Sequence, residues 1–180
     1  MPETDAQPKI ETIYAADEIE RRLAGLAGEI AAKNPTNLLV VPILKGSFVF
    51  AADLLRALNR VGLTPEVDFL TLSSYKKSRT SSGQVTILRD LDLHVEGRHV
   101  ILVDDVLDSG RTLAFAKDLI SARGATLIET CVLLEKQVAR AVNITADYSA
   151  FTCPNVFVVG YGMDVAHRYR ELPYVGRIVD

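Results

Sequence analysis

The chain has 180 residues, and single domains contain about 100–200 residues, so one domain is expected. Hydrophobic residues make up 48% of the chain and charged residues 24%, with 11 Gly and 7 Pro, which excludes collagen-like and broadly disordered proteins. There are 20 Lys and Arg against 23 Asp and Glu, and the resulting net charge of -3 argues against a broad basic face for nucleic acid.

The first residues and the cysteines indicate where the protein works. Residues 1–10 are polar and predict a flexible N-terminal arm, which leaves residues 11–180 as the single domain. No apolar run approaches the about 18 residues of a membrane span, so no membrane contact is expected. Cys131 and Cys153 belong to no C-x-x-C pair and are expected to be buried free thiols. Free thiols suit a reducing compartment, which predicts a cytoplasmic protein.

Helical and strand patterns alternate along the first half of the chain. Apolar residues recur with helical spacing over residues 17–33, which predicts an amphipathic helix. Residues 38–44 are almost all apolar, as in a strand that is covered on both faces of a parallel sheet. Helical spacing returns over residues 47–60, and residues 67–72 and 85–88 predict two further strands.

The second half continues the same alternation. A polar loop is predicted at residues 73–83, and residues 99–103 predict a second buried strand. A helix is predicted over residues 112–122, followed by a strand over residues 127–134. Strands that alternate with helices imply right-handed crossovers and an α/β sheet, in which ligands bind at the carboxyl ends of the strands.

The strongest functional pattern is VILVDDVLDSGRT, residues 100–112. An apolar strand leads into Asp104, Asp105 and Asp108, and Ser109-Gly110-Arg111-Thr112 then opens a helix. Small hydroxylated residues and a glycine at a helix N-terminus leave backbone N–H groups free for an anion such as phosphate. The alternative is a capped helix after an acidic turn. Three crowded carboxylates repel one another unless hydroxyls, a cation or a proton uses them, which favours a phosphate site beside acids that hold a diol.

Two other phosphate motifs do not fit the sequence. It has no G-x-x-x-x-G-K-[ST], and Gly160-Tyr161-Gly162 lacks the third glycine and the following helix of a dinucleotide fingerprint. The segment 100–112 instead resembles the phosphoribosyl pyrophosphate motif of the type I phosphoribosyltransferases, and the chain resembles their hypoxanthine-guanine branch of bacterial type. Further matching segments are residues 44–47, 73–75, 133–136, 157–164 and 169–174.

The resemblance implies an α/β fold of the type I phosphoribosyltransferase kind, with a central, mainly parallel sheet flanked by helices and a small hood formed by the termini. The purine-binding part of the hood would cover about residues 150–180. The implied reaction belongs to purine salvage. It transfers the 5-phosphoribosyl group from phosphoribosyl pyrophosphate to N9 of hypoxanthine or guanine, with Mg²⁺ and an oxocarbenium-like transition state, and gives IMP or GMP and pyrophosphate.

The resemblance also assigns the residues that bind the donor. Asp104 and Asp105 would face the ribose hydroxyls, although many relatives have Glu at position 104. The family often has a cis peptide before Lys45. The proposed metal ligands are Asp164, Asp104 and Asp105. The remaining assignments are Asp108, Ser109, Gly110, Arg111 and Thr112 for the 5′-phosphate, and Lys45, Gly46 and Arg170 for pyrophosphate.

The base is assigned to Lys136, Phe157, Val158 and Asp164 in the same way. Lys136 would donate to the 6-oxo group, Phe157 would stack on the ring and the Val158 backbone would bond the purine edge. Taken alone, Phe157 would be interpreted as a core residue. The catalytic residue would be Asp108, which accepts the N7 proton as N9 attacks.

Several alternatives remain open. Ser73, Ser74 and Tyr75 begin a mobile loop by resemblance, expected to close and exclude water, but a passive hairpin loop fits the same residues. The enzyme could prefer xanthine or guanine, because backbone carbonyls are expected to read the purine 2-position. A ligand-sensing regulator that binds nucleic acid is the second alternative, and no nucleic-acid partner is expected. The family resemblance suggests a homodimer or homotetramer.

Overall fold

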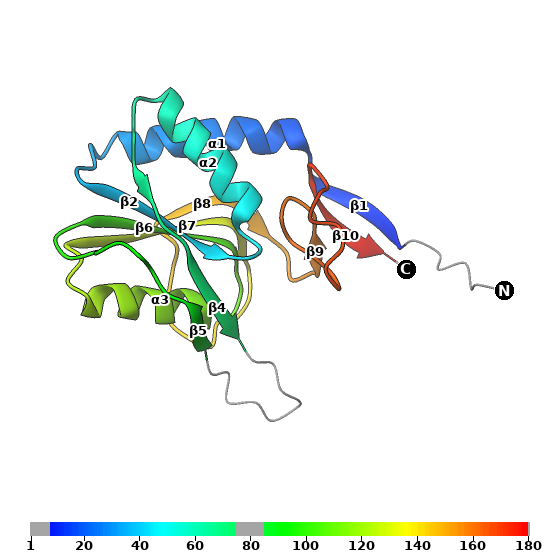
Figure 1. The fold of residues 1–180 in the computed structure, drawn as a ribbon. Helices are drawn as coiled ribbons and strands as arrows, with labels where there is room; N and C mark the ends of the chain where they lie inside the picture. Colours follow the sequence, from blue (N-terminus) through cyan, green and yellow to red (C-terminus); the bar gives the residue numbers. More distant parts are fainter. Residues whose placement is uncertain (1–7, 75–84, 180) are drawn as a thin grey trace.

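The computed structural model describes residues 8–74 and 85–179. A central sheet carries α1 and α2 on one face and α3 on the other, and a small sheet made by the chain ends lies beside it (Figure 1). In chain order the elements are β1 (Lys9–Tyr14), α1 (Ala16–Ala31), β2 (Leu38–Leu44), α2 (Phe48–Arg60), β3 (Glu66–Val67), β4 (Leu70–Ser74), β5 (Val85–Arg89), β6 (His99–Leu107), α3 (Arg111–Ala122), β7 (Leu127–Lys136), β8 (Tyr148–Cys153), β9 (Val158–Val159) and β10 (Val175–Val179).

The central sheet has the order β5-β4-β2-β6-β7-β8, with β3 paired to β2. All of these pairs are parallel except β4 with β5, which form an antiparallel pair around residues 75–84. The mainly parallel α/β fold and the hood formed by the termini are therefore confirmed. Parallel strands align their carboxyl ends at one edge, and this edge is where the predicted phosphate motif lies.

Alternate side chains of the central strands pack into two separate hydrophobic cores. In β2, Leu38 and Val40 join the core under α1 and α2, whereas Leu39 and Val41 join the core under α3. Successive side chains of a strand point to opposite faces, so a strand covered by helices on both sides must be apolar throughout. This requirement explains why the apolar run 38–44 predicted β2 with its observed bounds.

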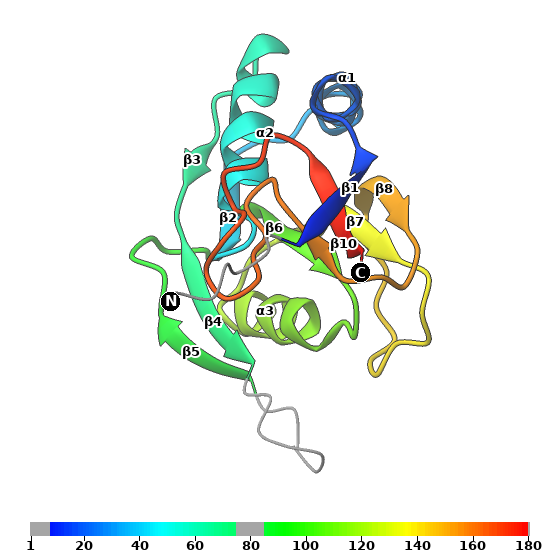
Figure 2. The same cartoon turned by 90° about the vertical axis from the view of Figure 1, so that its right-hand side faces the viewer.

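The hood is a small antiparallel sheet of order β1-β10-β9, which brings the two ends of the chain together. Figure 2 views the molecule from the hood end. β1 pairs with β10 from Lys9 onward, so Lys9 and Ile10 belong to this sheet and not to the arm expected at residues 1–10. Residues 1–7 of that arm lie outside the described residues.

Other predicted elements differ from the structure in their bounds. β6 continues beyond residue 103 to Leu107, because its register with β7 extends along the polar end of the strand. The strand predicted at 67–72 divides into β3 and β4, and β1 and β8 have no predicted counterpart. Ser73 and Ser74 end β4, paired with β5, and do not begin a loop. Tyr75 lies outside the described residues.

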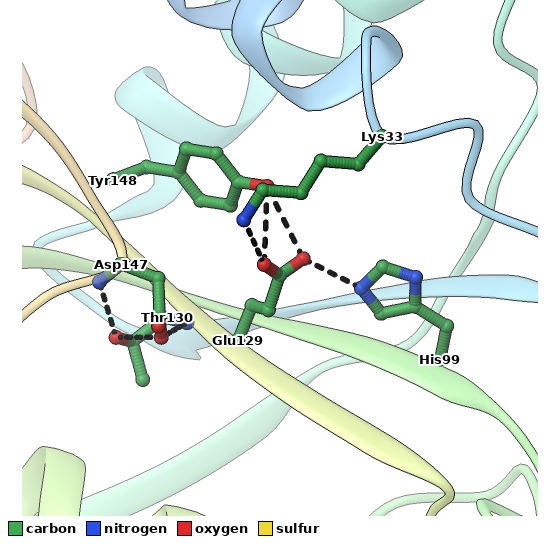
Figure 3. Close-up of polar contacts among 6 residues, drawn as sticks. All are labelled: Lys33, His99, Glu129, Thr130, Asp147 and Tyr148. Atoms are coloured by element: carbon green, nitrogen blue, oxygen red, sulfur yellow. Dashed lines mark hydrogen bonds and ion pairs between the residues drawn. The ribbon is translucent and has the colours of Figure 1, made fainter.

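A polar cluster with a buried centre connects the segment after α1 to the amino-terminal end of the central sheet, away from the phosphate motif. Glu129 of β7 lies between Lys33, His99 and Tyr148, and the neighbouring Thr130 pairs with Asp147 (Figure 3). The Lys33 Nζ to Glu129 Oε1 distance is 2.5 Å and the His99 Nε2 to Glu129 Oε2 distance is 2.7 Å. An ionised carboxylate only accepts hydrogen bonds, so the three neighbours all act as donors.

Two further expectations concern the compartment. Cys131 and Cys153 are free and buried, as predicted. Within residues 8–74 and 85–179, each helix is too short or too polar to cross a bilayer.

Candidate active site

Three strands deliver predicted site residues to the same edge of the sheet. Lys45 follows β2, Asp108 follows β6 and Lys136 ends β7. A cavity of about 490 Å³ opens at this edge. The lining residues to which the sequence assigned a role are Lys45, Gly46, Asp104, Asp105, Asp108, Ser109, Gly110 and Thr112. The other lining residues, which had no assigned role, are Ile43, Leu44, Leu72, Val106, Leu107 and Leu113.

The phosphate loop, residues 108–112, leads into α3, whose N-terminus has no side-chain cap. Gly110 is the N-cap residue of α3, and no side chain caps the helix there. The Arg111 N–H is 3.5 Å from the Ser109 hydroxyl, whereas the N–H groups of Thr112 and Leu113 remain available to an anion at the positive end of the helix dipole. Gly110 has a φ of 79°, and an added Cβ would lie 2.5 Å from Ile144 Cγ2, so the loop requires glycine here. Arg111 is exposed and does not line the cavity.

Asp104 and Asp105 are adjacent acids near the end of β6. Asp104 is buried, and its Oδ1 accepts a hydrogen bond from the Asp105 backbone N–H at 3.0 Å. Burial, together with the charge of Asp105, raises the pKa of Asp104 well above its usual range. Burial also raises the pKa of Asp105. Both shifts disfavour ionisation of the pair, and a nearby cation would counteract them.

The turn after β2 lies directly against this pair. The Leu44–Lys45 peptide bond is cis, as the resemblance implied. The Ser47 hydroxyl donates to the Ile43 carbonyl at 2.6 Å and fixes the turn. A Cβ on Gly46 would overlap the Asp105 carboxylate, so only glycine allows the turn to approach the acids this closely.

Lys136 connects β7 to the phosphate loop. Its Nζ lies 3.3 Å from Asp108 Oδ2, which brings the predicted base-binding lysine to the predicted catalytic acid. The Lys136 side chain is 11% exposed, whereas that of Asp108 is 56% exposed. The ammonium is thus held by the strand end, and the acid remains accessible to a ligand.

The hood contributes the remaining predicted residues. Phe157 is 60% exposed, which excludes the interpretation of this ring as core, and Val158 is buried in β9. The Asp164 carboxylate accepts the His167 backbone N–H at 2.8 Å and pairs with Arg170 at 2.9 Å. The predicted metal ligand and the predicted pyrophosphate residue are therefore partners of each other in this state.

Two contacts hold the hood against the site. A Cβ on Gly162 would lie 2.5 Å from the Gly46 carbonyl, so the hood backbone packs on the turn after β2. The Tyr161 hydroxyl donates to Asp53 of α2 at 2.6 Å. Arg170 donates to the Gly162 carbonyl at 2.7 Å and also lines a second cavity of about 760 Å³, between α1, α2 and residues 170–173.

The acids at this edge are suited to a Mg²⁺ ion that is also coordinated by a bound phosphate compound. Among residues 8–74 and 85–179, no three His, Cys, Asp or Glu side chains gather as a complete metal cage. Mg²⁺ in phosphate-binding sites usually takes one or two carboxylates and completes its shell with phosphate oxygens and water. Asp104 and Asp105 supply such a pair beside the uncapped α3 terminus.

The α/β sheet, with an acid pair and a helix N-terminus at one cavity, is the arrangement of the type I phosphoribosyltransferase fold. The family model of the phosphoribosyl transferase domain matches residues 9–166, and the chain belongs to this family. The chain is 39% identical over 173 residues to the hypoxanthine phosphoribosyltransferase of Escherichia coli K12, covering 94% of this chain and 96% of that one. A crystal structure of a hypoxanthine-guanine phosphoribosyltransferase from Bacillus anthracis superposes with a TM-score of 0.88 at 37% identity, covering 96% of this chain and 100% of that one.

Another relative is much longer than this chain. The chain is 45% identical over 165 residues to the bifunctional protein TilS/HprT of Listeria innocua, covering 91% of this chain and 25% of that protein. The chain thus spans about a quarter of that relative's length. The names of these relatives agree with the hypoxanthine-guanine branch that the motifs indicated.

Proposed function

We propose that the protein transfers the 5-phosphoribosyl group of phosphoribosyl pyrophosphate to N9 of hypoxanthine and guanine. The observation that carries this proposal is one cavity shared by an uncapped helix terminus, the acid pair Asp104 and Asp105, and the turn at Lys45-Gly46. A phosphate, a diol and a pyrophosphate would each find complementary groups there. The names of the relatives support the same reaction.

In this proposal, the first turn of α3 holds the 5′-phosphate through its backbone N–H groups. Asp104 and Asp105 accept hydrogen bonds from the ribose hydroxyls. Lys45 is exposed at the cavity rim and would bind the leaving pyrophosphate together with Arg170. Neutralising the leaving group allows the C–O bond at the anomeric carbon to break, and the nearby carboxylates stabilise the positive charge that develops there.

The base would approach from the hood side. Phe157 offers an exposed ring for stacking, and the Val158 backbone offers hydrogen bonds to the purine edge. Lys136 would donate to the 6-oxo group, which favours 6-oxopurines over adenine. Asp108 would accept the N7 proton as N9 bonds to the ribose carbon.

Mg²⁺ is the proposed cofactor, held by Asp104 and Asp105 and by Asp164 of the hood. When bound, it would neutralise the pyrophosphate charge. The chain from Lys9 onward is proposed to act as one domain, in a cytoplasmic homodimer or homotetramer.

The test is product formation from phosphoribosyl pyrophosphate, with hypoxanthine, guanine, xanthine, adenine and uracil offered separately, with and without Mg²⁺. Mg²⁺-dependent IMP or GMP would support the proposal and rank the bases. If the nucleotide of xanthine or of guanine is the dominant product, the preferred base is that one and not hypoxanthine. Donor binding without any product would refute catalysis and favour a ligand-sensing regulator, which a gel-shift assay with RNA and DNA would then examine.

A further inference from the structure

The loop after β7, residues 137–147, packs against the back of the phosphate loop. The backbone N–H groups of Ala141 and Val142 both donate to the Ser109 carbonyl, at 3.1 and 3.3 Å. The side chain of Ile144 fits against Gly110 so closely that a Cβ there would lie 2.5 Å from Ile144 Cγ2. Two residues of the phosphate loop therefore depend on this outer loop for their position.

Arg140 holds the outer loop in shape. One guanidinium nitrogen donates to the Ile144 carbonyl at 2.9 Å, and the other donates to Glu135 Oε1 at 2.6 Å. Glu135 lies in β7, so the arginine connects the far side of the loop to a rigid strand. The chain from residue 135 to residue 144 is thereby closed into a bracket, defined here as Glu135, Arg140 and Ile144.

Arg140 is more buried than is usual for an arginine in a loop, and this burial costs free energy. Its side chain is only 18% exposed, and its Nε–H is buried without a hydrogen-bond partner among the described residues. A buried polar group without a partner costs free energy that an exposed arginine would avoid. The guanidinium is thus placed by the bracket geometry and not by solvation.

We propose that Arg140 is a positioning residue for binding of the 5′-phosphate. Among the described residues, it forms no hydrogen bond with Asp108 and does not itself line the cavity. It acts through Ile144 and through the loop whose N–H groups hold Ser109. The backbone N–H groups of the phosphate loop bind a phosphate well only while they converge on its oxygens. Loosening the bracket would therefore weaken phosphate binding. This inference rests on the proposed function.

The test compares Arg140→Met, Arg140→Lys and Glu135→Gln with the unchanged protein. Arg140→Met is expected to raise KM for phosphoribosyl pyrophosphate and Kd for IMP about tenfold, while KM for hypoxanthine at saturating donor stays within about twofold. Arg140→Lys keeps the positive charge on a single donating nitrogen, which cannot span both acceptors as the guanidinium does, and it is expected to recover part of the loss. Glu135→Gln is expected to give a smaller effect that adds little to Arg140→Met, because both act on one bracket.

The matched control is Arg123→Met, which breaks another arginine–carboxylate pair, with two bonds of 2.7 Å to Asp90 outside the site. It should leave both KM values unchanged, whatever its effect on Tm. If Arg140→Met does not fold, Arg140→Lys and Glu135→Gln decide the question. The positioning role would be overturned if the unchanged protein is active and these variants have the same KM for the donor as it does. An inactive unchanged protein would instead overturn the proposed function.

Discussion

Replacing Glu129 by Gln is expected to destabilise the fold without changing catalysis. The Glu129 carboxylate is 6% exposed and accepts hydrogen bonds from Lys33, His99 and Tyr148 (Figure 3). Hydrogen bonds to an ionised acceptor contribute about 1.5–3 kcal/mol, against about 0.5–1.5 kcal/mol for neutral pairs. The substitution keeps the shape of the side chain but removes its charge.

The two buried partners, His99 and Tyr148, account for most of the loss. The hydrogen bond from each of these two residues would become weaker by about 1–1.5 kcal/mol on average. The bond from Lys33 contributes little because solvent screens its half-exposed side chain. We therefore expect Glu129→Gln to lower the free energy of unfolding by about 2–3 kcal/mol. For a domain of this size that corresponds to a fall in Tm of about 4–12 °C.

Urea unfolding followed by circular dichroism at pH 7 measures this loss. The control is Glu29→Gln, which removes an exposed carboxylate paired with Arg22 at 2.8 Å and should cost no more than about 1 kcal/mol. Lys136 lies seven steps along β7 from Glu129, which at about 3.3 Å a step is about 23 Å, so kcat/KM should not change. A Glu129→Gln protein as stable as Glu29→Gln would refute the argument.

The pH dependence gives the same prediction a second test. Burial alone would raise the pKa of Glu129, but the hydrogen bonds from Lys33 and His99 lower it below its usual range. A folded-state pKa below the unfolded value means that the stabilisation is present above the unfolded pKa, near 4.5, and is lost as the pH falls through the folded pKa. The difference between Glu129→Gln and the unchanged protein should therefore shrink as the pH falls below the unfolded pKa.

Three further predictions concern the site. Asp108→Asn should lower kcat about 100-fold or more while the Kd for phosphoribosyl pyrophosphate changes little, and an unchanged kcat in a rapid-mixing assay would exclude a general-base role. Lys136→Met should lower kcat/KM for hypoxanthine about 10- to 100-fold and leave that for adenine almost unchanged. Equal losses for both bases would contradict the assigned contact. Gly110→Ala forces a Cβ into Ile144 and a strained φ, so donor KM should rise about tenfold or more, and an unaltered value in steady-state kinetics would argue against the phosphate cradle.

The sequence predicted those parts of the site that depend on contiguous residues. The β2 run had to be apolar because helices cover both of its faces, and the segment 100–112 contains a whole strand end, acid pair and helix terminus in order. Local patterns carry such features because the residues that cooperate are neighbours in the chain. The fold class and the cavity-lining acids followed from them.

Features that depend on distant pairing could not be predicted from the residue pattern. β1 has a mixed burial pattern and forms because β10, more than 160 residues later, pairs with it from Lys9. The contacts of Glu129 with Lys33 and His99 join three separate elements, and only the sheet register brings them together. The Arg140 bracket is short in sequence, but its polar residues look like any exposed loop until burial is known.

The two ends of β6 and β7 contribute to different properties, stability at the amino-terminal end and ligand binding at the carboxyl end. β6 begins at His99 in the Glu129 cluster and ends at the acids of the cavity, while β7 runs from the cluster to Lys136. Because the strands between these ends are buried and apolar, a change of charge at one end has no polar route to the other. Substitutions in the cluster should therefore alter stability alone. The Arg140 bracket differs because it lies at the carboxyl edge, where a loss of order reaches the phosphate loop through two backbone hydrogen bonds and so changes donor affinity before it changes Tm.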